Sequence, residues 1–314
     1  MTSLKGMLAA SAAAAGLAGT ALAAPIGYTL AKDGTTLVVV PNLAAPGATM
    51  SIAITGAIGR VDAIDFRPAT GELVGYDSVS DRFYTINTAT GVATDISTPP
   101  LTPTTGRVLD IDWNPTIDRL RLVTSDDDNI VFNPVNGATT LATDLFYVAA
   151  DANFGEDPNI IGNGYTQSFF GPPNPQTPTR MTTQYVIDST TNDLGILANN
   201  LGSITTVAAL TLDGVPFDFG PEGGFDIYFD AALGQDIAYA ILEAGGVVGL
   251  FTLNLTNGAL TRLGDFAAEL ARLSGFTVAI APNEVPVPAA LPLFAAGLAG
   301  LSFARRRKKE AAAR

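Results

Sequence analysis

The strongest constraint on the fold of this chain is a pattern that its sequence repeats. Residues 61–75 and 108–122 match at a constant offset of 47. The matched pairs are Asp65 and Asp112, Phe66 and Trp113, Pro68 and Pro115, and Leu73 and Leu120. A second pattern places Asn or Asp three residues after an aromatic residue or Ile, and Gly or Asn four residues later, in residues 84–91, 130–137, 185–192 and 251–258. Repeats at this period indicate an array of similar small units.

Each copy of the second pattern predicts a β-hairpin. A β-branched or alternating run ends at Asn or Asp, whose side chain can bond to the backbone of the turn. Gly or Asn then takes the left-handed conformation that completes a type I turn with a bulge. Pro68 with Gly71, and Pro115 with Asp118, predict a similar turn after the first strand of each unit. Two hairpins per unit give a sheet of four strands.

An array of such sheets predicts an all-β protein with a β-propeller-like architecture of about five four-stranded blades. The expected first strands are residues 61–66, 108–113, 160–167, 224–229 and 274–280. The last has no hairpin after it, and the hairpin strands of residues 27–41 and 49–55 have no first strand before them. We therefore expect the C-terminal strand to join the N-terminal hairpin and close the ring. A sixth blade follows instead if residues 206–213 begin a separate unit.

Other folds and elements fit the pattern less well. The offset is too long for one turn of a β-helix, and the repeats are more alike than those of most sandwiches. Only residues 265–273 have the pattern of a helical turn or two. Residues 169–178 contain four prolines among polar residues, which predicts a surface loop inserted in the third unit.

The N-terminal residues predict a secretory signal peptide over residues 1–23. Lys5 supplies a positive charge, an apolar run of small residues follows, and Ala21 and Ala23 form a small-x-small cleavage site before Ala24. Export machinery and a signal peptidase are the partners that such a segment needs.

The C-terminal residues 285–314 predict a membrane helix with a basic end. The apolar run of residues 290–304 would span about 22 Å as a helix, which is short for a hydrocarbon core of about 30 Å. By the positive-inside rule, the basic cluster after it stays in the cytoplasm, and residues 24–284 then lie outside. That cluster consists of Arg305, Arg306, Arg307, Lys308 and Lys309.

The entry to this helix resembles a known sorting signal. Residues Val285, Pro286, Val287, Pro288 and Ala289 are similar to the Val-Pro-Leu-Pro-Ala type of C-terminal signal, a relative of the Pro-Glu-Pro type of Gram-negative bacteria, with Val287 in place of Leu. The resemblance implies cleavage by an exosortase-like protease and transfer from the periplasmic side of the membrane to the cell surface or the medium. A tail anchor that is never cut is the alternative.

The repeats also resemble a family of secreted bacterial proteins called domain of unknown function 4394. The likeness covers about residues 27–280 and is carried by residues 65–73, 84–91, 112–120, 224–227 and 251–258. It implies a propeller-like fold and no particular activity.

Composition narrows the chemistry of the body, residues 24–284. The body has ten Lys and Arg against 29 Asp and Glu, a net charge near −19, which argues against nucleic-acid partners. The chain has no Cys, so apolar packing and strand pairing must hold the fold together. It has no His, which excludes a Ser-His-Asp apparatus and any imidazole-ligated metal.

Carboxylates are the remaining candidates for chemistry. Strand alternation places Asp65, and in the equivalent strand Asp110 and Asp112, on faces that line a propeller channel, where they could bind a cation or a sugar. The alternative is that they bond to backbone groups and hold adjacent blades together. Asp65, Asp112, Glu156 and Asp226 are also enough carboxylates for a glycoside hydrolase, although sequence spacing does not give their separation.

Two acidic loops, residues 125–129 and 151–159, contain the oxygen ligands that calcium prefers. Their candidate ligands are Asp126, Asp127, Asp128 and Asp151. Neither loop matches the twelve-residue calcium loop, and a solvated acidic turn is the alternative.

From these patterns we expect an exported, membrane-sorted surface or matrix protein without catalytic activity or cofactor. The alternatives are a propeller that binds calcium or a sugar, such as an extracellular polysaccharide, and a carboxylate-dependent glycoside hydrolase.

Overall fold

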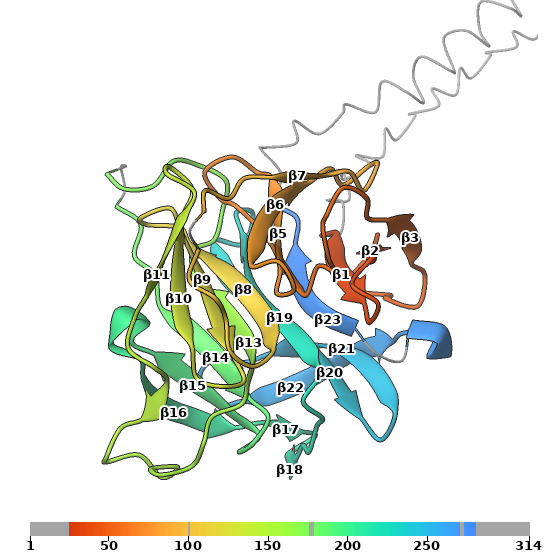
Figure 1. The fold of residues 1–314 in the computed structure, drawn as a ribbon. Coiled ribbons are helices and arrows are strands. Elements are labelled where there is room, and N and C mark those ends of the chain that lie inside the picture. Colours follow the sequence, from red (N-terminus) through yellow and green to blue (C-terminus); the bar gives the residue numbers. More distant parts are fainter. Residues whose placement is uncertain (1–24, 100, 176–178, 271–272, 281–314) are drawn as a thin grey trace, which may run out of the picture.

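The computed structural model describes residues 25–99, 101–175, 179–270 and 273–280 (Figure 1). They form five mainly antiparallel sheets, and the strands within each sheet follow the chain order expected of propeller blades. The fold is therefore the five-bladed, all-β propeller that the repeats predict. The signal peptide, the sorting motif with its helix, and the basic tail lie outside the described residues. Within the described residues, no helix is long and apolar enough to span a membrane.

The first sheet combines the two ends of the body. Its order is β23, β1, β2 and β3, and the pairing of β23 with β1 joins Val278 to Gly27 and Thr277 to Tyr28. The bounds are β23 Leu273–Val278, β1 Gly27–Ala31, β2 Thr36–Val40 and β3 Met50–Ala53.

The second and third sheets are the two units of the 47-residue repeat. The second comprises β4 Ala63–Phe66, β5 Leu73–Asp77, β6 Arg82–Ile86 and β7 Ala93–Asp95. The third comprises β8 Val108–Asn114, β9 Arg119–Thr124, β10 Asn129–Asn133 and β11 Ala138–Leu141. Aromatic side chains fill the space between them: Phe83 stacks on Phe132 with ring centroids 4.1 Å apart, and Trp113 meets Phe132 edge to face.

The last two sheets carry extra strands on their outer edges. The fourth has β13 Ile160–Tyr165, β14 Gln184–Asp188, β15 Asp193–Leu197 and β16 Ser203–Ala209, with β12 Phe146–Tyr147 parallel to β16. The fifth has β19 Gly223–Asp230, β20 Gln235–Ala244, β21 Val247–Leu253 and β22 Ala259–Asp265, extended by β17 Thr211–Leu212 and β18 Val215–Pro216. Residues 206–213 are divided between β16 and β17, so the six-bladed alternative is wrong.

The predicted hairpin turns form as expected. Gly91, Gly137, Asn192 and Gly258 all have φ between 58° and 72°, in the left-handed region. The preceding Asn or Asp bonds to the turn backbone, as where Asn87 Oδ1 accepts N–H bonds from Ala89 and Thr90 at 3.0 Å. Gly91 has a second reason to be glycine, because a Cβ there would lie 2.0 Å from the carbonyl oxygen of Ala53.

Helical structure is limited to two short 3-10 segments among the described residues, η1 Asn199–Leu201 and η2 Ala268–Leu270. The second lies where the sequence predicts a helical turn.

The innermost strands β4, β8, β13, β19 and β23 contact one another in turn around the axis of the molecule. Figure 1 shows β8, β13, β19 and β23 gathered near its centre. The strands run parallel to one another across the blade boundaries: Asp110 and Asp112 of β8 bond to Asn163 and Tyr165 of β13 in the same order. All five therefore begin at one end of the axis, which we call the entry end.

The proline-rich insertion lies at the opposite end of the axis and is more than a solvated loop. The backbone N–H groups of Gly171 and Asn174 donate to the carbonyl oxygens of Pro68 and Thr116, which follow β4 and β8. Arg180 is buried and anchors the segment, because its guanidinium donates to the carbonyl oxygens of Pro115 and Phe169. The insertion thus ties the far ends of neighbouring blades together.

Candidate functional site

The repeated aspartates connect each innermost strand to the next. Asp65 Oδ2 of β4 accepts the N–H of Trp113 in β8 at 2.9 Å, and Asp112 Oδ2 of β8 accepts the N–H of Tyr165 in β13 at 3.1 Å. The carboxyl groups of Asp65 and Asp112 thus bond to the backbone across blade boundaries, as expected if they hold adjacent blades together.

Similar hydrogen bonds between innermost strands occur in the blades where the sequence repeat is weaker. Asp226 Oδ2 of β19 accepts the N–H of Val278 in β23 at 2.6 Å. Thr277 of β23 donates from its hydroxyl to Asp65 Oδ1 at 2.8 Å and so joins the first sheet to the first repeat unit.

In β13 the position equivalent to Asp65 and Asp112 is Gly164. A side chain does not fit there, because a Cβ would lie 2.8 Å from Phe225 Cε1. Asp110 compensates for the missing side chain. Its Oδ2 accepts the N–H groups of Asn163 and Phe225, both at 3.0 Å, and so spans β13 and β19. We call Asp65, Asp110, Asp112 and Asp226 the axial carboxyl group.

Burial makes ionisation of these carboxyls costly. It raises the pKa of Asp226 to about 6. Burial also raises the pKa of Asp65, Asp110 and Asp112 well above the usual range, and repulsion from neighbouring aspartates adds to the shift. One oxygen of each carboxyl, Oδ2, already accepts a backbone N–H bond from a neighbouring innermost strand.

Of the four hydrolase candidates, the structure brings Asp65, Asp112 and Asp226 together at the axis. Glu156 is exposed in the loop between β12 and β13, and no hydrogen bond or ion pair of the described residues joins it to the other three.

The acidic loops are held mainly by bonds to their own surroundings. Asp128 Oδ2 accepts the Thr105 hydroxyl at 2.8 Å, and Asp151 accepts the backbone N–H and hydroxyl of Thr206 at 2.6 and 2.7 Å. Burial raises the pKa of Asp127 to about 7, and repulsion from Asp157 of the second loop contributes.

The structure therefore brings Asp127 close to the second loop without assembling the predicted ligands Asp126, Asp127, Asp128 and Asp151 into one site. Within the described ranges, no group of three or more carboxylates is arranged to hold a metal ion. Calcium binding stays a prediction.

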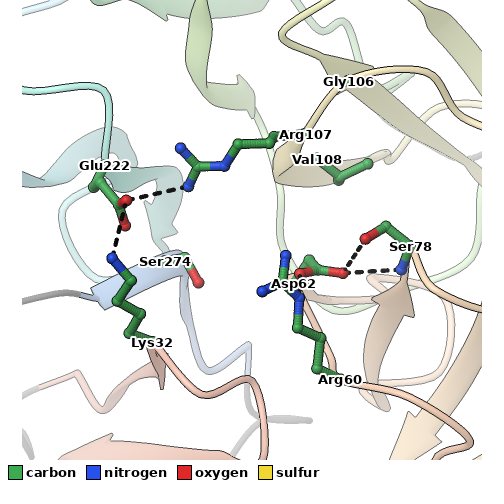
Figure 2. A pocket seen from close by; sticks show the side chains of 9 residues that line it. All are labelled: Lys32, Arg60, Asp62, Ser78, Gly106, Arg107, Val108, Glu222 and Ser274. Atoms are coloured by element: carbon green, nitrogen blue, oxygen red, sulfur yellow. Dashed lines mark hydrogen bonds and ion pairs between the residues drawn. The ribbon is translucent and has the colours of Figure 1, made fainter.

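A polar cavity of about 310 Å³ lies at the entry end of the axis (Figure 2). Its walls come from the segments that lead into the innermost strands and from two hairpin turns beside them. They are formed by Lys32, Arg60, Asp62, Ser78, Gly106, Arg107, Val108, Glu222 and Ser274. We call this cavity the entry pocket.

Two ion-paired groups face each other across the entry pocket, as Figure 2 shows. On one side, Arg60 Nε lies 2.8 Å from Asp62 Oδ1, and Asp62 Oδ2 accepts the backbone N–H and hydroxyl of Ser78. On the other side, Glu222 Oε1 lies 3.2 Å from Arg107 Nη2 and 3.8 Å from Lys32 Nζ.

The entry pocket differs in charge from the rest of the body. It holds three cationic and two anionic side chains, and Lys32 is the only lysine of residues 24–284. None of its lining residues is aromatic. A local excess of one positive charge in a strongly acidic body favours small polar ligands with anionic character.

Sequence analysis did not predict the entry pocket. Its residues are separated by up to 242 positions in the chain and meet only in the ring. One feature of the sequence could have indicated the entry pocket. Charged residues lie within three positions of the start of three expected first strands, namely Arg60, Arg107 and Glu222.

Comparisons with known proteins show the family of the chain. No curated protein matches the chain. A chain from the crystal structure of a nidogen/laminin complex has a TM-score of 0.44 and 11% identity, over 81% of this chain and 98% of that one. PorZ, a surface component of the type-IX secretion system of Porphyromonas gingivalis, has a TM-score of 0.35 and 12% identity, over 75% of this chain and 27% of that one. The family described as "Domain of unknown function (DUF4394)" matches residues 37–277, and the chain therefore belongs to that family.

Proposed function

We propose that this protein is exported, sorted through its C-terminal tail, and acts outside the cytoplasm as a non-catalytic module that binds an extracellular saccharide at the entry pocket. The observation that carries the proposal is the entry pocket itself. It is the point on the axis where side chains from several blades converge around a cavity, and its lining supplies both donors and acceptors for sugar hydroxyls.

A binding role is favoured over hydrolysis by the state of the axial carboxyl group. Glycoside hydrolysis needs two carboxyls about 5–9.5 Å apart with room for a sugar and water between them. Asp65, Asp112 and Asp226 are each at most 5% exposed and accept backbone N–H bonds. Asp62 of the entry pocket is ion-paired with Arg60, and Glu222 is ion-paired with Arg107 and Lys32.

The proposed location outside the cytoplasm is based on the sequences at the two ends of the chain. The signal peptide would direct export, and the motif from Val285 to Ala289 would direct sorting by an exosortase-like protease. An outside location would bring the entry pocket into contact with polysaccharides of the cell surface or matrix.

Affinity electrophoresis tests the proposal. The purified protein is run through native gels that contain neutral or acidic soluble polysaccharides, and the same mixtures are assayed for new reducing ends. We expect retardation by at least one polysaccharide, no release of reducing ends, and loss of retardation in Glu222→Gln. Asp218→Asn, which changes an exposed carboxylate outside the entry pocket, is the matched control. Retardation by none of the polysaccharides, or release of reducing ends, would contradict the proposal.

A further inference from the structure

The charges of the entry pocket are arranged with the cations outermost. The side chains of Lys32, Arg60 and Arg107 are 49%, 51% and 50% exposed. Their partners are far less accessible, with Glu222 at 18% and Asp62 at 10%. A molecule that enters the cavity therefore contacts the positively charged side chains first, and the carboxylates lie deeper in the cavity.

The cations also retain donors that their partners do not use. Arg60 contacts Asp62 through Nε, and both of its terminal amino groups have no hydrogen-bond partner among the described residues. A guanidinium presents its donors as a planar fork that matches the two oxygens of a carboxylate. Across the cavity, Lys32 and Arg107 share the single oxygen Oε1 of Glu222, so two positive charges there face one negative charge.

The remaining lining suits hydroxyl groups. Asp62 and Glu222 can accept hydrogen bonds from a ligand, and the Ser274 hydroxyl can donate or accept. The volume of about 310 Å³ is at the lower end of the range of about 300–1,000 Å³ that is usual for small-molecule sites. The cavity therefore fits a compact unit that has several hydroxyl groups and one negative charge.

We propose that the entry pocket is specific for a sugar that carries a carboxylate, a uronate, with the carboxylate held between Arg60 and the pair formed by Lys32 and Arg107. This inference rests on the proposed function and names the class of saccharide. The local excess of one positive charge matches one carboxylate. A doubly charged phosphate would leave the cavity with a net charge of −1.

The exposure of the cations makes the interaction depend on salt. Charge attraction between half-exposed groups is screened over a Debye length of about 8–10 Å at ordinary ionic strength. No aromatic ring lines the cavity, so stacking does not take over when the charges are screened. Affinity for a uronate should therefore fall as sodium chloride is raised.

Calorimetric titration of the purified full chain separates the contributions of charge and sugar. The two probes are methyl β-glucuronide and methyl β-glucoside, which share a ring and differ in the carboxylate. Acetate and inorganic phosphate report charge without the ring. We expect the glucuronide to bind at least about tenfold more tightly than each of the other three, which corresponds to about 1.4 kcal/mol.

Two variants test whether glucuronide binding takes place in the entry pocket. Arg60→Met should weaken glucuronide binding by about tenfold or more, because it removes a charged bidentate contact. Arg82→Met removes a positive charge from the outer strand β6 and should leave the affinity unchanged. Melting curves of both variants verify that they fold.

The possible outcomes distinguish a failure of the uronate inference from a failure of the proposed saccharide-binding function. Equal binding of glucoside and glucuronide overturns the uronate inference and leaves saccharide binding intact. Equal binding of acetate or phosphate and glucuronide shows a simple anion site and overturns the sugar-specific part of both. If no probe binds, the uronate inference falls, and retardation in polysaccharide gels decides the proposed function independently.

Discussion

Removing the carboxyl of Asp65 should destabilise the propeller more than removing that of Asp112, although the two residues are equivalent in the repeat. Both are buried, at 4% and 1% exposure, and Ala would leave a similar cavity at each. The difference lies in the hydrogen bonds. Asp65 accepts the N–H of Phe66 at 2.7 Å, the N–H of Trp113 at 2.9 Å and the hydroxyl of Thr277 at 2.8 Å.

Asp112 has fewer partners. Its Oδ2 accepts the N–H of Tyr165, and its Oδ1 is buried with no hydrogen-bond partner among the described residues. A buried donor left without an acceptor costs about 1–3 kcal/mol. Asp65→Ala takes an acceptor from two backbone N–H groups, of which that of Phe66 keeps only a 3.4 Å contact to Thr277 Oγ1, and should cost about 2–6 kcal/mol. Asp112→Ala leaves one N–H group without an acceptor and should cost about 1–3 kcal/mol. Burial raises the pKa of both carboxyls, so the relief from removing a buried acid offsets both losses in the same direction.

Equilibrium unfolding in urea, followed by far-UV circular dichroism and by the fluorescence of Trp113, measures the difference. Trp113 is the only tryptophan of the chain and is fully buried. The expected difference in unfolding free energy is about 1–3 kcal/mol, which corresponds to at least about 2 °C in melting temperature for a domain of this size. If Asp112→Ala is as destabilising as Asp65→Ala, or more so, hydrogen bonding does not set the contribution of these aspartates.

Four further predictions follow from the structure and the sequence. Burial raises the pKa of Asp226 to about 6, so its contribution to the free energy of unfolding is full below about pH 4 and falls by about 3 kcal/mol as the pH rises through about 6. Asp226→Asn should flatten the dependence of melting temperature on pH in this range, and an unchanged dependence contradicts this. Gly164→Ala should cost about 1–3 kcal/mol in urea unfolding through its clash with Phe225, and Gly47→Ala, whose Cβ would lie 3.8 Å from the carbonyl oxygen of Asp265, should cost little; equal costs refute the packing argument. A chelator should leave the melting temperature unchanged because the predicted ligands are not assembled, and a fall of several degrees would indicate a calcium site. Changing both Pro286 and Pro288 to Ala should leave the chain in the membrane with its full C-terminal mass, whereas a wild-type chain that still ends at Arg314 argues against processing.

The repeat pattern was sufficient to predict the blades because each blade is made by local interactions. Asn87 and Gly91 specify their hairpin within a few residues, and the strands on either side of it then pair. The equivalence of Asp65 and Asp112 likewise indicated a shared role across blades. The extra strands β12, β17 and β18 were not predicted because each is only two residues long, and because β12 and β17 pair with β16 and β22, which are distant in the chain.

The entry pocket was not predictable in the same way because its residues do not repeat. Lys32 and Glu222 are far apart in the chain, and their ion pair exists only because the first and fifth sheets are neighbours around the axis. Asp110 was recognised as facing the axis, but the reason for its presence, the gap at Gly164, depends on how closely β13 packs against Phe225. Charge and burial at such points are properties of the assembled ring.

The most direct test of the account is a crystal structure of the protein grown with methyl β-glucuronide. We predict that the sugar lies in the entry pocket, with its carboxylate within hydrogen-bond distance of Arg60 and of Lys32 or Arg107. The axial carboxyl group should be unchanged, with its backbone bonds in place. A sugar bound at Asp65, Asp112 and Asp226, or at another surface with the entry pocket empty, would contradict it.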